Sequence, residues 1–311
     1  MRMTQIPIPA TSAIKGVLLV SAAVFLFASG DTAAKILFAI YSIPLILALR
    51  YTLNVLILLA VFGPRHGLAL FRYRRPWLVL ARGVLLALSS FVFAMALQRM
   101  PVGETVAITY LAPFVVLLLA GPLLGEVVGR WGWVAAVGGF LGLLLIVRPG
   151  SGLNPAGVGF AMLSATATVG YHLLTRFLAR TETTLALLVS TALVGSVGYG
   201  TVLALTWPGM ASIPTPGLAQ VALLIGLALA STIGHFLFTA GYREAPAALL
   251  APVNYLHIVW ATLLGWAVFA HMPDALTIAG MGCVLASGAL VALRSARKPV
   301  DQIESSAQIG T

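Results

Sequence analysis

Two distant stretches of this chain repeat each other: RMPVGETVAITYLAPFVV at residues 99–116 and EAPAALLAPVNYLHIVWA at residues 244–261. With the chain shifted by 145 residues, Tyr110 falls on Tyr255 and the first proline of one stretch falls on the first proline of the other. The residues that precede these stretches align at a shift of 141. Self-similarity over so long a period indicates that a whole structural unit is duplicated.

The composition places this duplicated unit in a membrane. Of the 311 residues, 60% are hydrophobic and only 8% are charged, whereas a soluble domain carries about 25% charged residues. Such a chain cannot cover a surface that faces water. Its net charge of +10 would suggest a nucleic-acid partner in a soluble protein, but Lys and Arg gather in the cytoplasmic loops of membrane proteins. We therefore expect the lipid bilayer, and no nucleic acid, as a partner.

Ten stretches of the chain are long and apolar enough to cross a membrane. A spanning helix needs about 20 mostly apolar residues, and Pro, Gly and charge clusters mark the breaks. The predicted spans are 14–37, 43–62, 77–97, 102–123, 129–147, 156–178, 185–206, 217–240, 246–269 and 274–293. Each half then holds five spans, and an odd number inserts the second copy upside down. We predict an all-α integral membrane fold of two inverted five-helix repeats, residues 1–150 and 151–311.

The distribution of Lys and Arg sets the orientation of these spans. If the N-terminus lies inside, most of these cations fall at the inner ends of the spans, and the outer ends keep Lys35, Arg99 and Arg148. Cytoplasmic loops carry such an excess of positive charge. We expect both termini, including the polar tail at 294–311, on the cytoplasmic side of a bacterial-type inner membrane.

The chain resembles the drug/metabolite transporter superfamily, in its ten-helix EamA-type branch. Three segments carry the resemblance: LRYTLNVLIL at 49–58, ITYLAPFVVLLLAGPLLGE at 108–126 and GWVAAVGGFLGLLLIVRPG at 132–150. The resemblance implies a carrier that exports small metabolites. Amino-acid exporters, including aromatic ones, are the members that this sequence looks most like.

The second half departs from the family's pattern in the span at 246–269. The first half matches the family's mid-span proline with Pro113 and its closing acidic residue with Glu126. At the corresponding positions the second half has Ile258 and His271. This departure puts in doubt any role for a second acidic residue at the end of this span.

Polar side chains deep in two corresponding spans predict a solute cavity at the membrane midplane. In the span at 246–269, Asn254 and His257 recur on one helical face, with aromatic residues beside them. Transporters with inverted repeats bind their solute near the midplane, between the halves. The predicted cavity residues are Thr109, Tyr110, Asn254, Tyr255, His257 and Trp260. In the alternative interpretation, the Asn and His link helices and the aromatic residues only pack.

Ionisable groups inside spans tend to face the bundle interior or a wet cavity. Asp31 lies four residues before Lys35, on one helix face. The two form a neutralised interfacial anchor, or Asp31 lines the outer mouth of the cavity. Arg50 could bind a solute carboxylate through its fork of donors or tie helices together, and Arg82 is interpreted as an interfacial anchor. The second-tier cavity candidates are Asp31, Arg50, Tyr171, His172 and His235.

Small residues at four-residue spacing predict faces where helix backbones approach closely. Gly138 and Gly142 form such a pair in the first half, and Gly282 and Ala286 in the second half. These faces would pack within one protomer or between two, so a homodimer is one of the expected arrangements.

The leading hypothesis is a secondary transporter that exports amino acids or similar small metabolites by alternating access. The sequence has no phosphate-binding loop of the G-x-x-x-x-G-K-[ST] type, which argues against direct ATP hydrolysis. Nucleotide-linked or other metabolites are the alternative solutes. An intramembrane lipid-modifying enzyme is the alternative from another class, but the His residues stand singly, without carboxylates at ligand spacing. We expect no catalytic residue, no metal and no cofactor.

Overall fold

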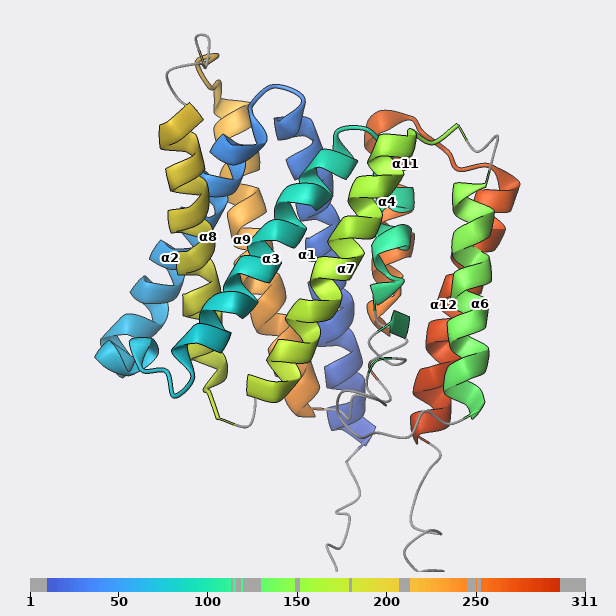
Figure 1. Ribbon diagram of the computed structural model, residues 1–311, viewed down its shortest axis with the longest axis horizontal. Coiled ribbons are helices and arrows are strands. Elements are labelled where there is room, and N and C mark those ends of the chain that lie inside the picture. Colours follow the sequence, from blue (N-terminus) through green and yellow to red (C-terminus); the bar gives the residue numbers. More distant parts are fainter. Residues whose placement is uncertain are drawn as a thin grey trace, which may run out of the picture.

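The structure is a computed structural model that describes residues 10–112, 114–115, 119, 130–148, 152–178, 181–206, 213–244, 250 and 253–296. Within these residues the chain forms ten α-helices and one 3₁₀ helix (Figure 1). They are α1 (Ala10–Phe38), α2 (Ile43–His66), η1 (Gly67–Phe71), α3 (Pro76–Leu97), α4 (Val102–Thr109), α6 (Arg130–Val147), α7 (Pro155–Leu178), α8 (Thr184–Thr206), α9 (Leu218–Glu244), α11 (Leu256–Phe269) and α12 (Ala275–Ala296). The predicted all-α class is confirmed for this part of the chain. The tail beyond residue 296 lies outside the described residues.

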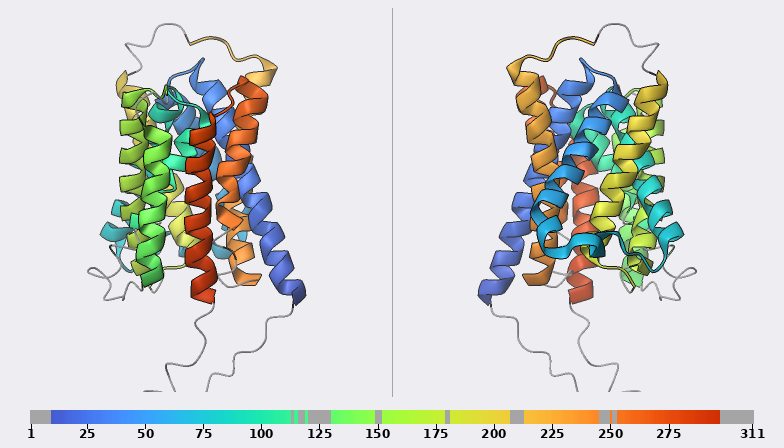
Figure 2. Two further views of the ribbon diagram at one scale, coloured as in Figure 1. Left: turned by 90° about the vertical axis from the view of Figure 1, so that its right-hand side faces the viewer. Right: turned by 90° about the vertical axis from the view of Figure 1, so that its left-hand side faces the viewer.

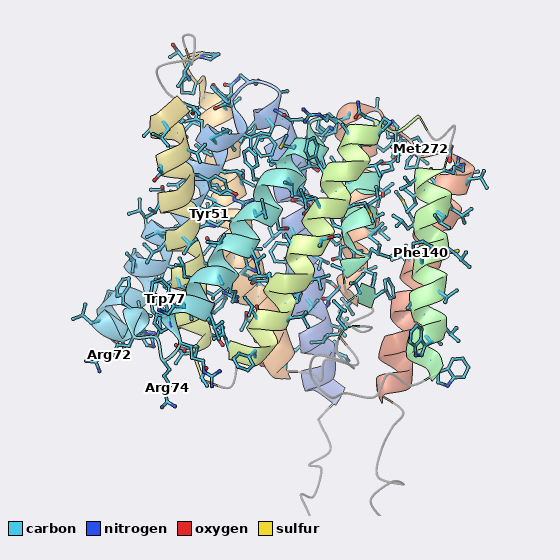
Figure 3. The ribbon with its side chains drawn as sticks, viewed as in Figure 1. Tyr51, Arg72, Arg74, Trp77, Phe140 and Met272 are labelled. Atoms are coloured by element: carbon cyan, nitrogen blue, oxygen red, sulfur yellow. The ribbon has the colours of Figure 1, made fainter. Side chains whose placement is uncertain are left out.

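Six of these helices are long and apolar enough to cross a membrane: α1, α2, α3, α7, α8 and α9. Their apolar segments run from 21 to 29 residues, against the roughly 20 that a bilayer requires. Helices α6, α11 and α12 contain shorter apolar segments. Helix α6 shows an exposed apolar face of the kind that contacts lipid. Trp133, Val137 and Phe140 recur there at helical spacing and are 56%, 55% and 51% exposed. Phe140 is labelled beside α6 in Figure 3.

Side-chain caps fix where three of the helices begin. The side chains of Asn154, Thr183 and Asp274 accept hydrogen bonds from backbone N–H groups three residues later, at 3.0, 3.2 and 2.8 Å. A cap of this kind satisfies one of the free N–H groups at a helix start. These residues therefore set the first turns of α7, α8 and α12.

Helices from the two halves of the sequence pack against each other in pairs. The most extensive pairs are α1 with α9, α3 with α7, α6 with α12 and α2 with α8, followed by α1 with α11, α3 with α8 and α4 with α11. The α6–α12 pair forms one side of the bundle (Figures 1 and 2). The start of α1 and the end of α12 lie at the same end of the bundle (Figure 2), as an even number of crossings requires.

The predicted small-residue face of α6 packs within the chain, whereas the predicted face of α12 does not meet another described part of the chain. A Cβ on Gly142 would meet the backbone carbonyl of Gly280 at 2.7 Å, and a Cβ on Gly138 would meet Ser287 Oγ at 2.5 Å. The contact therefore uses α12 residues other than the predicted ones. Gly282 has nothing within 4 Å, because it lies on the opposite side of α12.

Two helices are interrupted near the middle of the bundle, at corresponding positions of the repeat. Helix α4 ends at Thr109 and the chain turns at Tyr110, whereas α11 begins at Leu256 after a turn at Tyr255. The spans predicted at these places were continuous helices. A proline clashes with the carbonyl four residues before it, and Pro113, although outside the described residues, stands four residues after Thr109.

Candidate functional site

The two helix interruptions meet through the side chain of Tyr110. Its hydroxyl donates a hydrogen bond of 2.9 Å to the backbone carbonyl of Asn254 and lies 3.3 Å from Nδ1 of His257. Its ring centroid lies 5.2 Å from that of Tyr255. Four of the six predicted cavity residues therefore come together where α4 ends and α11 begins.

Helix α1 adds a carboxylate to this cluster. Oδ2 of Asp31 lies 3.2 Å from Nε2 of His257, and the two side chains are only 21% and 13% exposed. Nε2 makes no hydrogen bond with the described residues, so the contact rests on charge and distance rather than on alignment. A carboxylate, an imidazole and the phenol of Tyr110 thus lie in a row that joins three helices.

Lys35 does not neutralise Asp31, as the anchor interpretation required. Its Nζ donates to the backbone carbonyls of Leu97 and Met100, each at 2.5 Å. The two charges sit on one face of α1, but each finds a partner on another helix or connection. Asp31 therefore pairs with His257, and Lys35 bonds the connection between α3 and α4.

A cavity of about 260 Å³ lies at the end of the bundle where α4 begins. Its charged lining residues are Lys35, Arg99, Glu104 and His271. Glu104 is only 3% exposed, and its Oε1 lies 2.9 Å from Nε2 of His271. None of the six predicted cavity residues lines this cavity.

Sequence reasoning passed over Glu104, although the signal was present. It is a carboxylate near the start of the predicted span at 102–123, where an ionisable residue is costly and tends to be functional. Its contact with His271 could not be found, because 167 positions separate the two residues.

Helices α4 and α11 connect this cavity with the Tyr110 cluster. They pack so closely that a Cβ on Gly103 would overlap the side chain of Thr262. The cavity lies at one end of this pair, and Tyr110 and His257 lie at the other end. Asp31 and Lys35 lie four residues apart on α1, about 6 Å along the helix axis. Two groups of polar residues thus lie at opposite ends of one helix pair.

Comparison with known proteins places the chain in a family. A riboflavin transporter of Rhizobium johnstonii is 31% identical over 249 residues, an alignment that covers 76% of this chain and 78% of the relative. The sequence model of the EamA-like transporter family matches residues 14–148. The chain belongs to the EamA-like transporter family. The family resemblance in the sequence is thereby confirmed, and the protein is a small-molecule transporter of a membrane rather than an enzyme.

Other relatives of this EamA-like transporter are named for other solutes. The pseudopaline exporter of Pseudomonas aeruginosa is 29% identical over 286 residues, covering 91% of this chain and 97% of the relative. The S-adenosylmethionine uptake transporter of Rickettsia bellii is 26% identical over 225 residues, covering 72% and 75%. A crystal structure shares the fold with a TM-score of 0.61, at 20% identity, over 93% of this chain and 98% of that chain. Family membership alone therefore does not select a solute.

Two predicted cavity residues of this EamA-like transporter lie apart from the cluster. The Thr109 hydroxyl donates to the Val106 carbonyl of its own helix at 2.7 Å. Trp260 meets the ring of Phe25 edge to face, with centroids 5.1 Å apart, beside a small apolar cluster of α1. Thr109 bonds within its own helix and Trp260 packs on Phe25, so neither side chain is joined to Tyr110 by a hydrogen bond among the described residues.

Arg82 is not the interfacial anchor that the sequence suggested. It is 3% exposed and lies between α3, α7 and α8. Its Nε donates to Thr175 Oγ1 at 2.7 Å, and Nη2 donates to the Tyr171 hydroxyl at 2.8 Å. Nη1 donates to Thr191 Oγ1 at 2.6 Å and to a backbone carbonyl at 3.1 Å. Tyr171 is thus a partner of Arg82, while the neighbouring His172 is exposed.

His235 joins the cluster through an aromatic residue that sequence reasoning did not select. The ring of Phe27 lies 4.9 Å from that of His235 and 6.2 Å from that of His257. One turn before His235 on α9, Ser231 and Thr232 bond the side chain of Asn54, at 3.4 and 3.0 Å. Contacts therefore lead from the Tyr110 cluster through the Phe27 ring of α1 and polar side chains of α9 to Asn54 of α2.

Proposed function

We propose that this protein exports an amino acid or a similar small metabolite across the plasma membrane of a bacterium by alternating access. The observation that carries the proposal is the Asp31 carboxylate beside His257 and Tyr110, where two interrupted helices meet. Secondary transporters place their solute site at such discontinuous helices near the membrane midplane. A charged acidic side chain inside a span is costly in free energy, and such residues usually mark a functional site.

The pairing of the helices supports an inverted repeat, an architecture on which many alternating-access transporters are built. In the predicted correspondence α1 matches α7 and α3 matches α9. The α1–α9 contact then corresponds to the α7–α3 contact, while the α2–α8 and α6–α12 pairs map onto themselves. A two-fold axis between the halves would produce this pattern. The proposed repeats are residues 1–150 and 151–311, with five spans each.

The charges at the two ends of the bundle support cytoplasmic termini. Arg72 and Arg74 lie at the end of the bundle where α1 begins (Figures 2 and 3). Backbone N–H groups of Arg74 and Arg75 donate to Glu182 there, at 2.8 to 3.2 Å. Positive charge concentrates on the cytoplasmic side, so the 260 Å³ cavity would face outward. A homodimer stays a prediction.

An amino acid fits the cluster better than a nucleotide-linked solute does. Asp31 can bind an ammonium group, and the rings of Phe27 and Tyr110 offer aromatic surface on either side of His257. A solute with several phosphates would need several free cations in the interior. Among the described residues, Arg82 has its donors bonded within the protein and cannot serve.

The test is counterflow into liposomes that contain the purified protein. Labelled Phe, Trp, Thr, Met and Lys would be compared with riboflavin and S-adenosylmethionine, the solutes for which relatives are named. We expect saturable amino-acid counterflow that Asp31→Asn reduces at least about tenfold, the scale of one charge-assisted hydrogen bond. Ser29→Ala is the matched control on α1, because among the described residues the Ser29 hydroxyl bonds only the Phe25 carbonyl of its own helix, at 2.9 Å.

A folded wild-type protein that moves none of the amino acids would contradict the proposed solute. Counterflow of riboflavin or S-adenosylmethionine by that protein would identify the solute instead. If Asp31→Asn and Ser29→Ala show the same rate of amino-acid counterflow, the proposed solute stands, but Asp31 does not belong to its binding site.

A further inference from the structure

We infer that Arg50 binds the carboxylate group of the transported solute, at a site opposite Asp31. This inference rests on the proposed function and adds to it the group of the solute that is recognised. Arg50 lies on α2 among apolar residues, and its guanidinium is always charged. It stands over the ring of Tyr51 at 4.7 Å, which covers one face and leaves its edge donors free.

The hydrogen-bond inventory of Arg50 is incomplete. A guanidinium has five N–H donors. The structure gives one long bond, from Nη2 to Ser90 Oγ at 3.4 Å, and that oxygen already lies 2.8 Å from the Tyr51 hydroxyl. Nε is buried and has no hydrogen-bond partner among the described residues. Most N–H donors of the Arg50 side chain therefore have no hydrogen-bond partner among the described residues.

No carboxylate of the described part of the chain neutralises Arg50. Each of the described Asp and Glu residues has a partner elsewhere. These pairs are Asp31 with His257, Glu104 with His271, Glu182 with backbone N–H groups, Glu244 with Lys15 and Asp274 with Arg148. Arg50 is half-buried, and a cation inside a membrane span without a counter-ion is costly. An anionic group brought by the solute would remove this cost.

Packing contacts connect the helix of Arg50 with the helix of Asp31. One turn along α2, Asn54 bonds Ser231 of α9, and one turn along α9, His235 packs on Phe27 of α1. Asp31 follows Phe27 by one further turn. Helix α9 thus joins the two helices that carry Arg50 and Asp31, which have opposite charges.

This arrangement selects a class of solute. The fork of a guanidinium matches a carboxylate with two parallel hydrogen bonds, a geometry that lysine cannot supply. Asp31 offers the complementary acceptor for an ammonium group. The site therefore recognises a zwitterion with a free carboxylate, such as an α-amino acid, and discriminates against its amide.

The experiment measures the binding of acid and amide pairs to the full-length protein in detergent, by the shift of its thermal unfolding. The probes are phenylalanine and phenylalaninamide, methionine and methioninamide, and benzoate and benzamide. We expect the wild type to bind the amino acids at least about tenfold more tightly than their amides, because charge-assisted bonds contribute on that scale. Arg50→Gln should abolish this preference and leave amide binding unchanged. Arg72→Gln, an exposed arginine of the same chain, is the control that keeps the preference.

Arg50→Gln with the wild-type preference would overturn the inference. A second measurement covers the case in which this variant does not fold: phenylglyoxal modification of Arg50 in the wild type, read by mass spectrometry. Phenylalanine should protect Arg50 and phenylalaninamide should not, whereas equal protection, or none, would overturn it.

The benzoate pair separates this inference from the proposed function. If no amino acid binds or moves, the proposed solute is wrong. Benzoate binding that is lost in Arg50→Gln would still place a carboxylate site at Arg50. Benzoate binding that is absent or unaffected in that variant would overturn the inference as well.

Discussion

Arg82 and Arg50 are both arginines inside apolar helices, and their surroundings differ in one respect. Arg82 donates to two threonine hydroxyls, one tyrosine hydroxyl and one backbone carbonyl. Arg50 has a single long bond to Ser90 and a buried Nε without a partner among the described residues. Each also lies over a tyrosine ring, at 4.4 Å for Arg82 and 4.7 Å for Arg50. Both arginines thus stack on a tyrosine ring, and they differ in how many of their N–H donors are hydrogen-bonded.

This difference shows that a charge in a predicted span does not by itself reveal a role. A buried polar group costs little when its bonds are complete and much when they are not. The guanidinium of Arg82 has hydrogen-bond partners on α7 and α8 and therefore holds α3, α7 and α8 together. The guanidinium of Arg50 has few such partners, and in our proposal the carboxylate of the solute supplies them.

The largest effect is expected for Arg82→Gln. A shorter amide cannot reach all of the Arg82 partners, and buried hydroxyls of α7 and α8 would lose a charged donor. We expect a loss of about 3 kcal/mol in the free energy of unfolding, measured by denaturant titration in detergent micelles. Arg72→Gln, at an exposed arginine (Figure 3), should stay within about 0.5 kcal/mol of the wild type. Equal unfolding of the two variants would show that the Arg82 joint contributes nothing.

A smaller effect separates the partners of the two arginines. Thr191→Val removes an acceptor 2.6 Å from Arg82 in a buried position, and we expect a loss of about 1 to 2 kcal/mol. Ser90→Ala removes the long bond to Arg50 and should cost less than about 1 kcal/mol. The same titration measures both variants. If Ser90→Ala proves as costly as Thr191→Val, Arg50 would be a structural residue like Arg82.

The smallest effect concerns a third arginine, at the edge of the bundle. Asp274, which lies outside the helices, accepts from Thr277 and pairs with Arg148 at 2.5 Å. The hydrogen bonds from Thr277 and the charge of Arg148 lower the pKa of Asp274 below its usual value. The resulting stability is present above the unfolded pKa of Asp274 and is lost as the pH falls through the lowered folded value.

The measurement for this pair is the unfolding temperature between pH 7 and pH 3, with Asp274→Asn beside the wild type. Because the pair is exposed, the pH-dependent difference should be small, and it should shrink as the pH falls. A constant difference between the two proteins over this range would show that the Asp274 charge is not what matters.

Much of the fold could be predicted from the sequence because it depends on composition and local pattern. Apolar segments long enough for a bilayer, the repeat that places Tyr110 on Tyr255 and the family motifs are properties of the chain itself. The site could be predicted in part. Tyr110, Asn254, Tyr255 and His257 were selected and do come together. Thr109 and Trp260 were selected by the same pattern and lie elsewhere, because helical spacing gives a face but not the neighbour of that face.

The sequence by itself determined that this protein is an all-helical membrane transporter of the EamA-like family, since hydrophobic burial and the repeat are encoded residue by residue. Only the tertiary structure decided which charges have partners. It joined Asp31 to His257 instead of Lys35, joined Glu104 to His271, completed the bonds of Arg82 and left those of Arg50 open. Hydrogen bonds are short and directional, so a partner is fixed only when helices far apart in the sequence pack side by side.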